Sequence, residues 1–153
     1  QFTGDESLSG TNNKVKLNFN HPVKFLVWVV KASGAANFVY NDGASPAINN
    51  VATSKLQLNG HDRFSERSGD YFNWVQPYQC FGASPASGIN VYSFALKPAE
   101  HQPSGTANMS RIDNATLNIT LRSTLTAGTA KVYAVNYNVL RIMSGMGGLA
   151  YSN

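Results

Sequence analysis

Short runs of alternating apolar and polar residues, separated by turn residues, constrain the fold of this chain more than any other feature. Residues 14–20 alternate strictly, so that Val15, Leu17 and Phe19 share one side. Successive side chains of a strand point to opposite faces, so this run predicts a strand with one buried face. Residues 23–31 are apolar at nearly every position, which predicts a strand buried on both faces.

Four more strands are expected along the rest of the chain. They cover residues 55–58 before the turn pair Asn59-Gly60, residues 89–96 with Tyr92, Phe94 and Leu96 on one face, residues 115–122, and a long final strand with Tyr133, Val135, Tyr137 and Val139 on one face. Short strands separated by glycine, proline and asparagine turns, without a long helix, predict an all-β sandwich or barrel. The expected core positions are Val15, Leu17, Phe19, Trp28, Phe94, Leu117 and Val135.

Two stretches between these strands differ from the rest. Residues 32–52 are expected to form a long loop that faces outward, because a dense turn cluster fills residues 41–46. Residues 63–79 predict a short helix or strand between Gly69 and Pro77, with its aromatic side chains in the core.

Length and composition narrow the class of protein. A chain of 153 residues is long enough for one domain around a single core. Only 13% of its residues are charged, against about 25% in ordinary soluble domains. A polar but uncharged surface suits packing against other protein subunits, and it suits a carbohydrate-binding domain equally well. The longest apolar run, residues 25–30, is too short to span a membrane.

Charge and cysteine content exclude two further classes. The basic residues give a formal net charge of +4, but they are scattered and form no stripe that would track phosphates. We therefore expect no sequence-specific binding of nucleic acid. Cys80 is the single cysteine, which excludes an internal disulfide and predicts a buried structural thiol in a reducing compartment.

No motif in the chain predicts catalysis or a cofactor. Residues 145–150 mimic a glycine-rich dinucleotide motif, but only three residues follow, too few for the helix that such a site needs. We interpret them as a flexible glycine tail that lies on a neighbouring surface. His21, His61 and His101 are too scattered for a local metal-ligand pair. The expectation is a protein that is not an enzyme, with no cofactor and no metal.

Three Asn-x-Ser/Thr sequons lie within thirteen residues, at Asn108, Asn114 and Asn118. Such sequons are acceptors for N-glycosylation in secreted proteins. Asn118 and Thr120 also belong to the polar face of a predicted strand, where such residues are common. The three asparagines are therefore candidate glycosylation sites, with an ordinary surface role as the alternative.

A series of longer motifs makes this chain similar to one protein family, in that family's order and over nearly the whole chain. The motifs are residues 20–24 with Trp28, 58–64, 71–78, 89–113 with its proline-glycine loop, and 139–153. On these motifs the chain resembles the C-terminal half of the major capsid proteins of the nucleocytoplasmic large DNA viruses, most closely those of algal viruses. One departure is Ala107, where relatives often have a larger residue or cysteine.

This resemblance implies a fold and a function. The fold is an eight-stranded jelly-roll β-sandwich over residues 1–153, the second half of a double jelly-roll capsid protein. The first jelly roll is absent, the chain is expected to be a fragment, and its first strand is expected to be partial near residues 1–3. Loops 32–52 and 82–88 would form outer surfaces or trimer contacts.

The function that the resemblance implies belongs to the complete subunit. Homotrimers would form the pseudo-hexagonal capsomers of an icosahedral shell, in contact with neighbouring capsomers and minor capsid proteins. The location would be the virion capsid, assembled in the host cytoplasm. Two alternatives from other classes stay open: a lectin-like jelly roll that binds carbohydrate, and a cupin-like enzyme, which the lack of clustered His and Glu disfavours.

Overall fold

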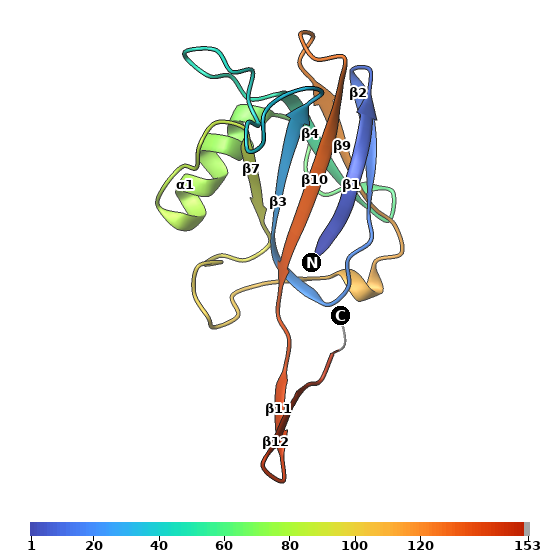
Figure 1. Cartoon of the computed structure of the whole chain (residues 1–153). Helices are drawn as coiled ribbons and strands as arrows, with labels where there is room; N and C mark the ends of the chain where they lie inside the picture. The colour runs from blue at the N-terminus through green and yellow to red at the C-terminus, as the bar shows by residue number, and fades with distance from the viewer. Residues whose placement is uncertain (152–153) are drawn as a thin grey trace.

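Two antiparallel sheets packed face to face make up most of the computed structural model, which describes residues 1–151 (Figure 1). The first sheet has the strand order β1-β10-β3-β7, with β8 also paired to β3, and the second has the order β2-β9-β4-β5, with β6 also paired to β4. The strands are β1 (Phe2–Ser9), β2 (Asn12–Leu17), β3 (Pro22–Ala32), β4 (Val51–Leu58), β5 (His61–Asp62), β6 (Arg67–Ser68), β7 (Ile89–Ser93), β8 (Ala107–Asn108), β9 (Ala115–Leu121), β10 (Ala127–Asn136), β11 (Leu140–Met143) and β12 (Met146–Leu149).

The pairing confirms an eight-stranded jelly roll. β7 and β8 lie along the same edge of β3, because Val23 pairs with β10 on one side and with β8 on the other. β5 and β6 likewise share the edge of β4 that β9 leaves free. Each sheet therefore has four strand positions, and two of the eight are each filled by a pair of short segments.

The core lies between the sheets, where the alternation of the sequence placed it. Trp28 is fully buried, and its ring centroid lies 5.1 Å from that of Phe72. The expected core residues Val15, Leu17, Phe19, Trp28 and Leu117 are all buried. The predicted turn at Asn59-Gly60 is also confirmed, since both residues have positive φ and join Leu58 to its partner His61.

The predicted strand over residues 89–96 is too long. β7 ends at Ser93, whose hydroxyl accepts from the amide of Ala95 and donates to the carbonyl of the same residue. This local turn diverts the chain from the sheet, so that Leu96 is 84% exposed. Phe94 is half-buried and packs on the margin of the core.

The predicted face of the last strand is wrong. In β10 it is Ala130, Val132 and Ala134 that point into the core, whereas Tyr133 and Val135 are each 40% exposed on the outer face. The strand ends at Asn136, so Tyr137 and Val139 do not continue it. Alternation alone gives two apolar faces in this strand. The buried face was not predicted because Ala130 and Ala134 are small and the side chains of the other face are larger.

Three other segments correct the expectations. Residues 63–79 contribute a π-helical turn (Tyr71–Val75) that runs into the helix α1 (Gln76–Phe81), which ends at Gly82 in the left-handed conformation. The first strand is not confined to residues 1–3, because β1 pairs with β10 up to Ser9. Finally, the glycine-rich tail forms the hairpin β11–β12, which projects away from the sandwich (Figure 1); its last two residues, Ser152 and Asn153, lie outside the described part.

Candidate assembly surface

Part of the outer face of the first sheet is apolar, which is unusual for a sheet face turned to water. The rest of this face is polar and carries the ion pair of Lys131 with Asp5. Phe2 lies opposite Tyr133 in the pairing, and Tyr133 lies opposite Val27. The rings of Phe2 and Tyr133 stack with centroids 4.7 Å apart. In the same way Val135 lies opposite Phe25 on this face. An apolar surface therefore crosses from β1 through β10 to β3.

The helix α1 continues this surface beyond β3. Phe81 packs its ring edge-on against Phe25, with centroids 5.2 Å apart. Trp74, in the π-helical turn before α1, and Tyr78, four residues later, are 51% and 65% exposed. We call the outer side chains of Phe2, Phe25, Val27, Trp74, Tyr78, Phe81, Tyr133 and Val135 the apolar outer face.

Part of this surface was missed by the sequence analysis. The aromatic residues of 63–79 were expected in the core, and Phe72 is indeed buried, but Trp74 and Tyr78 are exposed. A spacing of four and then three residues from Trp74 through Tyr78 to Phe81 is the stripe of an apolar helix face, and it was the available signal. The apolar run of residues 23–31 had indicated that β3 is covered on both sides.

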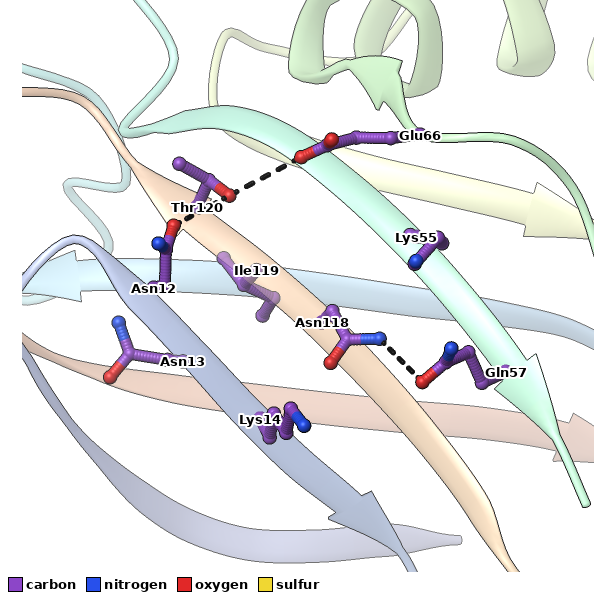
Figure 2. A pocket seen from close by; sticks show the side chains of 9 residues that line it. All are labelled: Asn12, Asn13, Lys14, Lys55, Gln57, Glu66, Asn118, Ile119 and Thr120. Atoms are coloured by element: carbon purple, nitrogen blue, oxygen red, sulfur yellow. Dashed lines mark hydrogen bonds between the residues drawn. The ribbon is translucent and has the colours of Figure 1, made fainter. Parts of the chain in front are cut away.

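The outer face of the second sheet is polar by contrast. Lys14 and Lys55 lie on either side of Asn118 in the pairing of β2, β9 and β4. Figure 2 shows the Asn118 amide turned toward Gln57, to whose Oε1 it donates over 3.0 Å. A polar face of this kind is stable in contact with water, whereas the exposed apolar residues of the first sheet favour contact with protein.

The structure places the three sequon asparagines in different settings. Asn118 is half-buried in the middle of β9, and its side-chain amide is bonded to Gln57. Asn108 is exposed and caps a short 3₁₀ helix (Met109–Arg111), accepting from the Ser110 amide over 3.2 Å. Asn114 is exposed just before β9 begins. Asn108 and Asn114 are therefore more exposed than Asn118.

The remaining candidate residues do not converge. His21 precedes β3 and stacks on Tyr151, His61 begins β5, and His101 lies in an exposed loop. Among residues 1–151 no group of three or more His, Cys, Asp or Glu side chains is placed to hold a metal ion. Cys80 is half-buried rather than buried, and desolvation raises the pKa of its thiol. Within the same residues no helix is long and apolar enough to cross a bilayer.

Comparison with known proteins decides the family. Residues 1–148 match the family described as the large eukaryotic DNA virus major capsid protein. The chain belongs to this family. It is 56% identical to the major capsid protein of Pyramimonas orientalis virus, across 100% of this chain and 41% of that protein. It is 43% identical to the major capsid protein of Phaeocystis pouchetii virus, across 100% of this chain and 47% of that protein.

A solved capsid shares the fold of this major capsid protein domain. The quasi-atomic model of the PBCV-1 virus capsid superposes with a TM-score of 0.84 at 38% identity, covering 100% of this chain and 50% of that one. The resemblance to algal virus capsid proteins and the jelly-roll fold are thus confirmed. The family consists of structural proteins, not enzymes. The chain spans about half the length of the relatives it matches.

Proposed function

We propose that this chain is the C-terminal jelly roll of a double jelly-roll subunit, and that the complete subunit builds the shell of an icosahedral virion. Three such subunits would form a pseudo-hexagonal capsomer. The observation that carries the proposal is the apolar outer face, since a sheet face with exposed Phe2, Tyr133 and Val135 requires a protein partner. The twofold greater length of the relatives supports a second domain as one such partner.

The chemistry of this face suits a protein interface. Aromatic side chains are enriched in the buried centres of interfaces, where charged side chains are depleted. Trp74, Tyr78 and Phe81 supply aromatic anchors, and the chain has few charges that would need to be desolvated. The polar face of the second sheet would then remain in contact with water or with polar surfaces.

Several finer features belong to the same proposal. Capsomers would contact neighbouring capsomers and minor capsid proteins, and assembly would take place in the host cytoplasm. Loops 32–52 and 82–88 would provide outer surface or trimer contacts. If the chain is glycosylated, exposure favours Asn108 and Asn114 over Asn118, and the side chain of Asn108 is already engaged as a helix cap.

Light scattering after size exclusion tests the proposal. Residues 1–153 alone should give a monomer or irregular aggregates, whereas the full-length subunit should give defined trimers, because the fragment lacks the partner for its apolar outer face. Tyr78→Ser combined with Val135→Ser should reduce aggregation of the fragment. Lys14→Ser, on the polar face, is the matched control and should not. A discrete, stable trimer of the fragment would contradict the two-domain arrangement.

One observation favours the alternative function of carbohydrate binding: a groove lined by amide side chains on the polar outer face of the second sheet. Its lining includes Asn12, Asn13, Gln57 and Asn118 (Figure 2). Amide side chains can hydrogen-bond sugar hydroxyls in such a groove. Binding of the monomer to a glycan array would favour this function, and loss of that binding in Asn12→Ala would place it in the groove.

A further inference from the structure

The hairpin β11–β12 is the segment that the sandwich leaves most isolated. Figure 1 shows it extending beyond the end of β10, away from both sheets. All eight residues of its two strands are exposed. The hairpin has therefore no packing partner within residues 1–151.

Both faces of the hairpin carry exposed apolar side chains, and one of the two faces also carries Arg141. Leu140 pairs with Leu149 and Ile142 with Gly147, which places three large aliphatic side chains on one face. Met143 pairs with Met146 on the other face. Ile142 is 70% exposed and Met146 is 74% exposed. A two-stranded hairpin is marginally stable alone in water, so a hairpin with exposed apolar side chains on both faces needs protein on both sides.

Hydrogen bonds close the base of the hairpin, and one ring contact joins this base to the sandwich. The Asn138 side chain donates to the Tyr151 carbonyl over 3.0 Å and accepts from the Tyr151 amide over 3.2 Å. The Ala150 amide donates to the Val139 carbonyl over 2.8 Å. Tyr151 in turn stacks on His21, with ring centroids 5.3 Å apart. The hairpin thus leaves the sandwich in a defined direction.

Both ends of the described chain meet at this base. The Asn20 amide donates to the Gln1 side chain over 2.9 Å, next to His21 against which Tyr151 stacks. The relatives are about twice as long as this chain. An additional half that belongs to the same polypeptide would have a high effective concentration at the hairpin.

We propose that the hairpin β11–β12 docks between surfaces of the additional jelly-roll half of its own polypeptide and thereby locks the two halves together. This inference rests on the proposed two-domain function. Gly147 and Gly148 favour such docking, because they leave the middle of β12 without side chains and allow close approach of another backbone. Arg141 is the single charged residue of the two strands, so little charge must be desolvated.

Hydrogen exchange of the full-length protein tests this proposal. In the monomeric full-length subunit, the amides of residues 140–149 should exchange at least about tenfold more slowly than the amides of the turn cluster 41–46. The reason is that the additional half covers the hairpin. Strand β10 serves as the protected reference. Protection that appears only in trimers would overturn the proposal in favour of a neighbouring copy. Fast exchange in every state would overturn it outright.

A substitution in the full-length chain adds an independent readout. Ile142→Asp should speed the exchange of residues 140–149 by about tenfold or more without altering β10, because a carboxylate is costly to bury. Phe38→Asp is the matched control, since Phe38 is 85% exposed in the loop between β3 and β4. Unchanged hairpin exchange in Ile142→Asp would count against docking.

Electron microscopy of the same samples separates this inference from the proposed function. Trimers whose monomers leave the hairpin unprotected would retain the capsomer function and remove the docking inference. A protected hairpin in a subunit that never trimerises would support the docking inference and contradict the capsomer function.

Discussion

Asn49 donates from its side-chain amide to the side-chain oxygen of Asn90 over 2.6 Å, and both residues are buried. This bond joins the end of the long loop before β4 to strand β7. Asn49 also donates to the Gly69 carbonyl and accepts from the Val51 amide. The pair therefore connects three segments that are distant in sequence.

Asn90→Leu should destabilise the fold by about 2 to 4 kcal/mol, because the substitution leaves a donor of Asn49 unpaired in the interior and removes the bonds that Asn90 makes. The lost bonds include those to the Trp28 and Gly88 carbonyls. Urea unfolding of dilute protein, followed by tryptophan fluorescence, measures the change. Asn37→Leu, at an exposed loop position, is the control and should stay within about 0.5 kcal/mol of the parent. Equal effects of the two substitutions would contradict a structural role for the pair.

Two valines of β10 provide a matched test of which face is buried. Val132 is fully buried and Val135 is 40% exposed. Val132→Ala should cost about 2 to 3 kcal/mol of unfolding free energy, through lost burial and a residual cavity. Val135→Ala should cost less than about 1 kcal/mol in the isolated chain. The reverse order in a denaturant titration would mean that the faces of β10 are assigned wrongly.

Gly105, in the proline-glycine loop after β7, should not tolerate a side chain. Its φ is +135°, and an added Cβ would lie 2.8 Å from the Phe94 carbonyl oxygen. Gly105→Val should therefore lower the thermal midpoint and the yield of capsomers. Gly43→Val is the control, because Gly43 also has positive φ but open space around it. Its loss should be smaller, about 1 kcal/mol of backbone strain.

Asp42 gives the long loop before β4 a dependence on pH. Its carboxylate accepts from the backbone amides of Ile48 and Ala44, and these bonds lower the pKa of Asp42 below its ordinary value of 3.8. A lowered pKa in the folded state means that the carboxylate stabilises the loop above the ordinary value and loses this effect as the pH falls through the folded-state pKa.

The amide resonances of Ala44 and Ile48 should consequently titrate together below pH 3.8 in a heteronuclear NMR series. Asp42→Asn should abolish that titration. Ala44 and Ile48 resonances that titrate together above pH 3.8 would contradict a lowered pKa of Asp42.

The sequence by itself determined the class of fold. Alternation in residues 14–20 and 115–122 predicted half-buried strands, which the structure has at Asn12–Leu17 and Ala115–Leu121. Asn59-Gly60 predicted a tight turn, which is confirmed. These features are local, because a strand's period and a turn's φ angles depend on residues within a few positions. The motif series then indicated the capsid family.

Only the tertiary structure decided which apolar residues meet the core. In β10 both alternating sets are apolar, and pairing with β1 and β3 turned Val132 inward and Val135 outward. The same holds for the turn at residues 71–75, where Phe72 packs beside Trp28 whereas Trp74 is 51% exposed. Burial depends on strands and helices that are distant in sequence, so the periodicity of one segment shows that it has two faces but not which of them another sheet will cover.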